Sequence, residues 1–119
     1  MAVEVEFTDE FGEWWEGLPP DEQDSVRDGV ELLRQYGVSL PFPYSSGVAG
    51  SAHSHMRELR VHHAGRPFRI LYAFNPLRTG ILLIGGDKTG NGRWYETFVP
   101  IADRLYDEHL KELKQEGLI

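Results

Sequence analysis

The sequence predicts an α+β domain in which helices cover a mainly antiparallel β-sheet. Three runs that suit β-strands follow one another at residues 55–63, 68–75 and 81–84, separated by short turns rich in glycine and proline. Helical patterns lie on both sides of this block, and a further short strand opens the chain. Successive strands without helices between them favour antiparallel pairing, with the helices packed on the sheet. A length of 119 residues suits one domain spanning 1–119.

The first expected elements are a short strand and a short helix. Residues 3–7 alternate apolar and acidic side chains, a period of two that predicts a strand with one buried face. Thr8 or Asp9 then suits the start of a helix that runs through Trp15, because a side-chain oxygen can accept the free N–H groups of the first turn.

A longer helix is expected from Pro20 to Tyr36. Proline suits the first helical turn, where a missing N–H costs nothing, and acidic residues follow where the helix dipole favours negative charge. Its buried face is an apolar stripe at helical spacing, formed by Val26, Val30, Leu33 and Tyr36. Gly37 suits the C-terminal end of this helix. Residues 38–51 are rich in Pro, Gly and Ser and are expected to form a loop.

The second half of the chain is expected to hold the central strands and the last helix. Residues 68–75 and 81–84 are apolar on both faces, which is typical of central strands covered on two sides. Residues 55–63 instead place two apolar side chains between charged ones. Pro100–Gly117 has apolar residues at helical spacing, so a final helix is expected there.

Charge is unevenly distributed along this chain of net charge −7. Residues 52–95 hold seven basic and two acidic side chains and four of the five histidines, whereas the flanking segments are acidic. This asymmetry predicts a local anion-binding surface, although basic side chains also line exposed strands that bind nothing. With no cysteine and no run near the ~18 apolar residues of a membrane span, we expect a soluble, cytoplasmic protein without disulfides or a membrane partner.

The stretch GGDKTGNGRWYETF, at Gly85–Phe98, invites comparison with a phosphate-binding loop. A P-loop requires glycine before its lysine, whereas Asp87 precedes Lys88 here, so this interpretation is disfavoured. The histidines near residue 55 offer nitrogen ligands for a metal, but their spacing fixes no carboxylate beside them. We therefore expect a strand end that delivers side chains, with no metal and no cofactor.

Arginines on the neighbouring strands are candidates to meet that strand end. Because side chains alternate along a strand, Arg57 is expected on the Leu59 face and Arg60 on the opposite face, with Glu58. Arg69 stands inside an apolar strand and needs a partner if it is buried, for which Glu58 is a candidate. Gathering all three arginines at one site would require a strong twist or a bulge.

Three segments resemble a known family. RELRV at 57–61, FRILYAF at 68–74 and LLIGGDKTGNGRWYETFVPIADRLYDEHL at 82–110 are similar to the phage-derived HigB-like branch of the RelE/ParE toxin superfamily. The resemblance implies a compact RelE-like sheet with an N-terminal helical hairpin and a C-terminal helix. It also implies the toxin of a type II toxin–antitoxin system, a metal-independent endoribonuclease (mRNA interferase) that cuts mRNA, usually on the ribosome.

The resemblance, together with the chemistry of RNA cleavage, assigns roles to individual residues. When the 2′-OH attacks the adjacent phosphate, cationic side chains stabilise the pentacoordinate phosphorus and another group exchanges protons. Tyr95 or a histidine is expected in that second role, and Tyr95 can act as the base only if neighbouring cations lower its pKa. The catalytic set is Arg69, Lys88 and Tyr95, and the RNA-binding set is Arg57, Arg60, Arg93, His53 and His55.

Two alternative functions stay open at this level. A ParE-like toxin would poison DNA gyrase without cutting RNA, and an inactive module of the same fold would only bind a protein partner. The resemblance implies a HigA-like helix-turn-helix antitoxin as the partner, with mRNA and the ribosome as targets. The acidic helices between residues 9 and 36 are candidates for part of the antitoxin docking surface.

Overall fold

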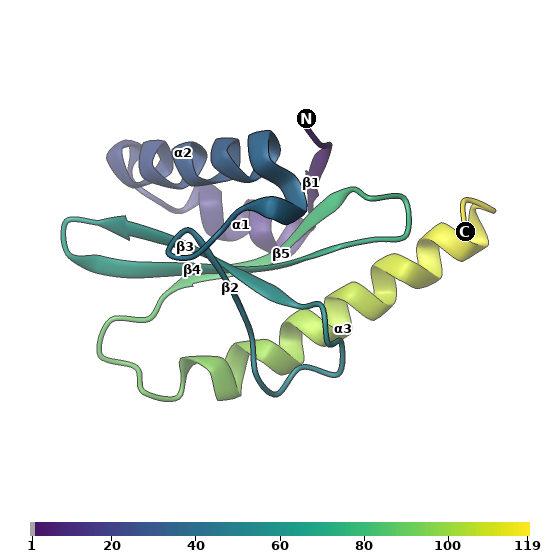
Figure 1. Cartoon of the computed structure of the whole chain (residues 1–119). Helices are drawn as coiled ribbons and strands as arrows, with labels where there is room; N and C mark the ends of the chain where they lie inside the picture. Colours follow the sequence, from purple (N-terminus) through teal and green to yellow (C-terminus); the bar gives the residue numbers. More distant parts are fainter. Residues whose placement is uncertain (1) are drawn as a thin grey trace.

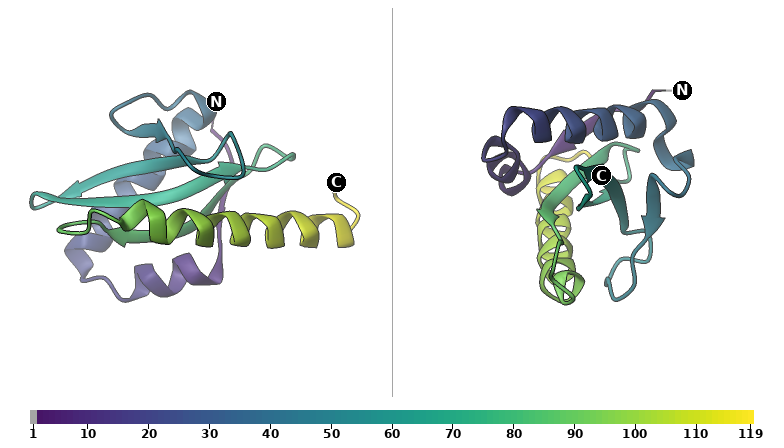
Figure 2. Two further views of the ribbon diagram at one scale, coloured as in Figure 1. Left: turned by 90° about the horizontal axis from the view of Figure 1, so that it is seen from below. Right: turned by 90° about the vertical axis from the view of Figure 1, so that its left-hand side faces the viewer.

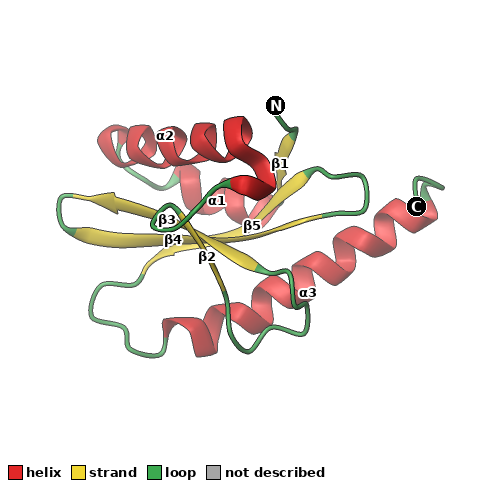
Figure 3. Cartoon of the chain, in the orientation of Figure 1, coloured by secondary structure: helices red, strands yellow, loops and turns green. Residues whose placement is uncertain are grey.

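The computed structural model describes residues 2–119, which form a five-stranded sheet with helices on both faces (Figure 1). The elements in chain order are β1 (Val5–Phe7), α1 (Asp9–Glu16), α2 (Pro20–Tyr36), the 3₁₀ turn η1 (Gly37–Ser39), β2 (Ser45–Gly47), β3 (Arg57–His63), β4 (Arg66–Phe74), β5 (Gly80–Asp87) and α3 (Trp94–Gln115). The strand order is β1-β5-β4-β3-β2, in which β1 runs parallel to β5 and the other pairs are antiparallel. The predicted α+β class is confirmed (Figure 3).

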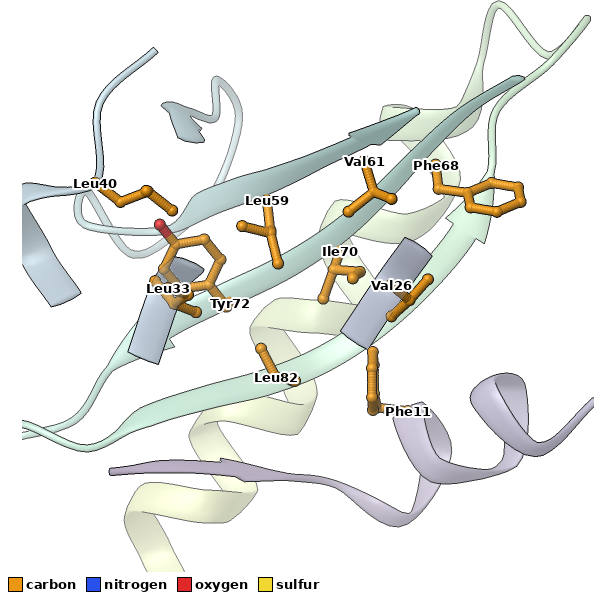
Figure 4. Close-up of a cluster of buried hydrophobic side chains, with 10 residues drawn as sticks. All are labelled: Phe11, Val26, Leu33, Leu40, Leu59, Val61, Phe68, Ile70, Tyr72 and Leu82. Carbon is orange, nitrogen blue, oxygen red and sulfur yellow. The ribbon is translucent and has the colours of Figure 1, made fainter. Parts of the chain in front are cut away.

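Two hydrophobic cores lie on opposite faces of the sheet, which separates α1 and α2 from α3 (Figure 2). The first core packs the sheet against α1 and α2 (Figure 4), and its buried residues are Phe11, Val26, Leu33, Leu40, Leu59, Val61, Phe68, Ile70, Tyr72 and Leu82. The second core packs the sheet against α3, and its buried residues are Met56, Leu71, Ala73, Ile81, Leu83, Trp94, Val99, Ala102, Leu105 and Tyr106. Strands β4 and β5 contribute to both cores, which explains why they are apolar on both faces.

The N-terminal segment follows the prediction except at Phe7. Thr8 caps α1, because its Oγ1 accepts a hydrogen bond from the backbone N–H of Phe11 at 3.0 Å and donates one to the carbonyl of Leu83 at 2.7 Å. Phe7 is 64% exposed, so the prediction of a fully buried face for this strand is wrong there. The reason is that β1 lies at the edge of the sheet, where the ring packs over Gly12 with its outer side in solvent.

Helix α2 begins at Pro20 and ends before Gly37, whose positive φ of 57° suits glycine. Val26 and Leu33 are buried as expected, but Tyr36 is 55% exposed and does not belong to the buried stripe. The expected loop at 38–51 contains the strand β2, which pairs with β3. Its sequence, Ser-Ser-Gly, has no intrinsic strand preference, so the pairing comes from the tertiary structure.

Helix α3 begins at Trp94, six residues before the predicted start at Pro100. A proline inside a helix removes one backbone hydrogen bond, which makes it a better first-turn residue than an interior one. Here Pro100 is exposed, so water can reach the carbonyl that loses its partner, while the buried Trp94 anchors the first turn. Among residues 2–119, no helix combines the length and the apolar character needed to cross a bilayer.

Candidate active site

Strands β3 and β4 bring Glu58, Arg60 and Arg69 to the sheet face that packs against α3. Arg60 lies directly opposite Arg69 in the antiparallel register, and Glu58 lies opposite Leu71, a residue of the second core. Tyr95, in the first turn of α3, reaches the same place and donates its hydroxyl hydrogen to Glu58. We call these four residues the Glu58 cluster: Glu58, Arg60, Arg69 and Tyr95.

Glu58 is the centre of this cluster and is only 5% exposed. Its Oε2 accepts a hydrogen bond from the Ser46 hydroxyl at 2.5 Å and lies 3.3 Å from Nη1 of Arg60. Its Oε1 accepts the hydrogen bond from Tyr95 and lies 3.5 Å from Nε of Arg69. Two guanidinium groups therefore share one buried carboxylate, so the cluster carries a net positive charge. Removal of the carboxylate would leave both guanidinium groups without a countercharge.

Arg69 is 3% exposed, so its guanidinium does not face solvent. Its Nη1 donates to the carbonyl of Phe68 at 3.0 Å, and its Nε lies 3.5 Å from Oε1 of Glu58 without a hydrogen bond. The pairing of Arg69 with Glu58 that the sequence indicated is therefore present. The expectation that Arg69 itself contacts a cleaved phosphate is not met in this arrangement, because the residue is covered and holds Glu58 in place.

Tyr95 and Lys88 adjoin each other at the exposed side of the cluster. Nζ of Lys88 lies 5.6 Å from the centroid of the Tyr95 ring, and both residues are half-buried. Burial, and then the hydrogen bond to Glu58 and its charge, raise the pKa of Tyr95 above its usual value. The condition for Tyr95 to act as the base, a pKa lowered by neighbouring cations, is therefore not met, because burial and then the contact with Glu58 outweigh the effect of Arg69.

Arg57 lies on the opposite face of β3, as the alternation of side chains predicted. Its Nε donates to the hydroxyl of Ser45 at 2.9 Å, and that hydroxyl lies 2.6 Å from the hydroxyl of Tyr72, a residue of the first core. Neither twist nor a bulge brings Arg57 to the Glu58 cluster.

His53 and His55 lie near the middle of α3 and away from the cluster. Nε2 of His53 is 2.7 Å from Oδ1 of Asp107, and Nε2 of His55 is 3.1 Å from the hydroxyl of Tyr106. Tyr106 follows Tyr95 by three helical turns, or about 16 Å along the helix axis. The alternative in which a histidine replaces Tyr95 in proton exchange therefore has no support in this geometry. Residues 2–119 contain no group of three or more His, Asp or Glu placed to hold a metal ion.

The fold and the cluster can be compared with known proteins. A family model for Gp49-like phage-derived proteins (DUF891) matches residues 13–107 of the chain. The chain belongs to the Gp49-like family. The candidate toxin HigB3 of Mycobacterium tuberculosis is 45% identical to this Gp49-like chain over 98 residues, covering 82% of the chain and 84% of HigB3. HigB2 of the same organism, also named as a candidate toxin, is 37% identical over 103 residues, covering 85% of the chain and 51% of HigB2.

Two solved structures share the fold of this Gp49-like chain. RelE in the RelE–RelB complex of Pyrococcus horikoshii superposes with a TM-score of 0.56 at 13% identity, covering 77% of this chain and all of RelE. A mutant of Escherichia coli RelE in the free state superposes with a TM-score of 0.57 at 10% identity, covering 95% and 99% of the two chains. The chain is therefore a HigB/RelE-like toxin of a toxin–antitoxin system, as the three sequence segments predicted.

The turn after β5 of this Gp49-like toxin is closed by Asp87. Oδ1 of Asp87 accepts hydrogen bonds from the backbone N–H of Thr89 at 2.9 Å and from its hydroxyl at 2.6 Å, and Oδ2 lies 3.1 Å from Nη1 of Arg66. Asp87 thus stabilises a tight turn that places Lys88 beside Tyr95. Arg93 is exposed and precedes the first residue of α3. The stretch from Gly85 to Phe98 is therefore a strand end, as predicted, followed by a turn and the start of α3, and not a phosphate-binding loop.

Replacing Asp87 with asparagine should make the free energy of unfolding less dependent on pH in the acid range. Burial alone would raise the pKa of Asp87, but the hydrogen bonds from Thr89 and the charge of Arg66 hold it below its usual 3.8. The charged form therefore stabilises the fold above that pH, and this contribution is lost as the pH falls through the lower folded-state pKa. We expect Asp87→Asn to cost about 0.5 kcal/mol at neutral pH. The cost should vanish once the pH falls below the folded-state pKa of Asp87, measured by thermal unfolding across the acid pH range.

Two participants in the site were not identified from the sequence. Phe42 lies in the loop after η1 with its ring 5.2 Å from the guanidinium carbon of Arg60, and it is 68% exposed. The only sequence signal for it is an aromatic residue between two prolines, in a segment too polar to bury it. Ser46 is the second, and it reaches Glu58 only because β2 pairs with β3.

Three surface hollows of the described chain lie elsewhere. The largest, of about 540 Å³, is formed by β1, the start of α1 and the second half of α3. A second, of about 200 Å³, lies between α1 and α2, and a third, of about 260 Å³, lies beside Arg57 and Phe74. None of these three is lined by Lys88 or by the Glu58 cluster, so the candidate site is a surface patch and not one of these hollows.

Proposed function

We propose that this Gp49-like toxin is a metal-independent endoribonuclease that cuts mRNA, on the ribosome, at the Glu58 cluster and Lys88. The observation that carries the proposal is the meeting of two arginines, a tyrosine and a lysine at one end of the sheet, around one carboxylate. A phosphate entering this patch would meet the partly exposed Arg60 and the ammonium group of Lys88, while the buried Arg69 adds positive charge behind them. Fixed cationic donors of this kind stabilise a phosphorane without a metal.

The raised pKa of Tyr95 decides how protons would move. Tyr95 stays a neutral phenol, so it acts as a relay: its oxygen takes the proton of the attacking 2′-OH while its own proton passes to Glu58. The 2′ oxygen forms a bond to phosphorus, and the bond from phosphorus to the 5′ oxygen breaks. The ammonium group of Lys88 gives a proton to that 5′ oxygen, so the products are a 2′,3′-cyclic phosphate and a 5′-hydroxyl.

The remaining residues divide into support and RNA binding. Arg69 is a positioning residue that holds Glu58, and the partly exposed Arg60 binds the phosphate with its fork. Arg93 extends the positive patch, and the exposed ring of Phe42 offers a surface on which an unpaired base can stack. Arg57, His53 and His55 lie apart from this patch and are no longer part of the proposed site.

Purified protein tests the proposal directly. We expect Tyr95→Phe and Lys88→Ala each to slow cleavage of single-stranded or ribosome-bound mRNA by about 10²–10⁴-fold, because each removes one proton transfer. Lys111→Ala is the control, since Lys111 is exposed on α3 far from the cluster. Cleavage is measured by mapping RNA ends and their terminal phosphates. Unchanged cutting by both variants would end the assignment.

One observation favours a second candidate, a module of the same fold that binds a partner without catalysis. Glu58 already engages both Arg60 and Arg69, which lowers the positive charge available to RNA. Absence of cleavage with and without ribosomes, together with normal growth during overexpression, would favour the inactive module. Growth arrest without RNA cleavage would instead favour the gyrase-poisoning alternative.

We also propose a cytoplasmic antitoxin of the HigA-like helix-turn-helix type as the partner. Two observations support an antitoxin: relatives named as candidate HigB toxins, and an archaeal RelE of the same fold that was solved in complex with RelB. A toxin that cuts mRNA in its own cell needs such a partner to hold it inactive.

A further inference from the structure

The largest of the three hollows described above lies at the end of α3 remote from the Glu58 cluster. Its walls are the second half of α3, the segment from Glu6 to Glu10 and the turn between β4 and β5, and its volume is about 540 Å³. The first residue of α3 in this wall, Leu105, follows Tyr95 by ten positions, or about 15 Å along the helix axis. We call this hollow the acidic groove.

The acidic groove has an apolar floor and apolar side chains at its rim. Buried residues of the floor include Ile81, Leu105 and Leu113. At the rim, Phe7 is 64% exposed, Leu77 is 48% exposed and Leu118 is 52% exposed. Large apolar side chains that gather around a concave surface and stay exposed are typical of a protein-binding site.

Carboxylates line the same groove on both sides, and they are Glu6, Asp9, Glu10, Glu108, Glu112 and Glu116. Glu108 and Glu112 of α3 and Glu116, just after its last residue, recur every fourth position, so they form a row along one side of the helix with a rise of about 6 Å between neighbours. Like charges at this spacing destabilise a helix by a few tenths of a kcal/mol per pair. Among residues 2–119, the only ion pair made by this row joins Glu108 to Arg104 at 3.3 Å. The row therefore carries negative charge that the described chain leaves largely unbalanced.

We propose that the acidic groove binds a basic amphipathic helix of a partner protein. The apolar face of that helix would cover the rim residues, and its lysines or arginines, four residues apart, would match the row of Glu108, Glu112 and Glu116 in spacing and in sign. RNA cannot be the occupant, because its phosphates would meet carboxylates on both walls. The inference is independent of the nuclease proposal, since the groove shares no residue with the Glu58 cluster.

A designed peptide tests the groove in the full-length toxin. The probe is a fluorescein-labelled helix of about four turns, with leucines on one face and lysines every fourth residue beside them. Its binding to the protein is followed by fluorescence anisotropy. We expect saturable binding that weakens by about tenfold in Glu112→Lys and weakens between about 50 mM and about 300 mM NaCl. A peptide with glutamate in place of lysine should not bind.

Asp28→Lys supplies the matched control, because it makes the same change of charge at an exposed position on α2, outside the groove. It should change the affinity by less than about twofold. Equal binding by Glu112→Lys and the wild-type protein would overturn the proposal, as would equal binding of the lysine and glutamate peptides. The proposal would also be overturned if sedimentation showed that the wild-type protein is a dimer and that Glu112→Lys is a monomer. The occupant of the groove would then be a second copy of the chain.

Discussion

Gly86→Ala is expected to lower the free energy of unfolding by about 3 kcal/mol and the melting temperature by about 10 °C. A Cβ at this position would lie 2.6 Å from Nε1 of Trp94. Trp94 cannot move away, because it is 1% exposed and its ring stacks on Phe98 with the centroids 4.7 Å apart. The added carbon must therefore displace α3 from the sheet, and with it Tyr95. Far-UV circular dichroism during urea and thermal unfolding measures the loss.

Gly85 shows the same constraint on the other face of β5. A Cβ there would lie 2.9 Å from Cη2 of Trp14, in α1, because successive residues of a strand point to opposite faces. Because Gly85 and Gly86 have no side chains, Trp14 can pack against one face of β5 and Trp94 against the other. Gly92→Ala is the control for Gly86→Ala, since no atom lies within 4 Å of a Cβ at that position. Equal stability of the two variants would mean that Trp94 does not pack against Gly86 as described.

Glu58→Gln is expected to destabilise the protein by about 3–5 kcal/mol, because it leaves buried Arg69 without its countercharge. The amide keeps the size of the side chain but carries no charge, so the loss reports the ion pair and not a cavity. Replacing Arg69 with methionine in the same protein should restore part of the stability, since the uncompensated charge is then removed. Urea unfolding of the single and double variants measures the coupling.

The surface pair between Glu31 and Arg34 provides the comparison for this prediction. These side chains are exposed and lie 3.4 Å apart on α2, so Glu31→Gln should cost less than about 1 kcal/mol. If Glu58→Gln costs no more than Glu31→Gln, the buried ion pair with Arg69 does not contribute as the structure indicates. In the proposed relay Glu58→Gln should also abolish RNA cleavage at temperatures where the variant is still folded.

Much of the fold could be predicted from local patterns. Apolar runs bounded by turns located the central strands, and apolar residues at helical spacing located the long helices. The cap of the first helix was narrowed to Thr8 or Asp9, and the structure has Thr8. The errors have a common cause. Strand β2 and the start of α3 depend on pairing with β3 and on the burial of Trp94, which outweigh the weak strand preference of Ser-Ser-Gly and the presence of Pro100.

The sequence predicted which residues meet at the candidate site better than it predicted the role of each residue. Arg60, Arg69, Lys88 and Tyr95 were identified from the sequence, and the structure brings them together. The roles proposed for Arg69 and Tyr95 changed because they depend on distances to Glu58, which no sequence pattern gives. Burial of Tyr95, and then the contact of its hydroxyl with Glu58, raise its pKa, whereas action as a base required a lowered one.

By itself, the sequence determined the α+β class, the order of most elements, the superfamily and the concentration of basic residues in the middle of the chain. These properties follow from local periodicity, from composition and from segments that match a known family. All three can be recognised from the order of residues along the chain. The tertiary structure alone decided that Arg57 and Arg69 lie on opposite faces of the sheet, that two arginines share the carboxylate of Glu58, and that carboxylates from both ends of the chain line one groove. Electrostatic interactions depend on distance in space and on burial, and both are set only when the strands pair and the helices pack.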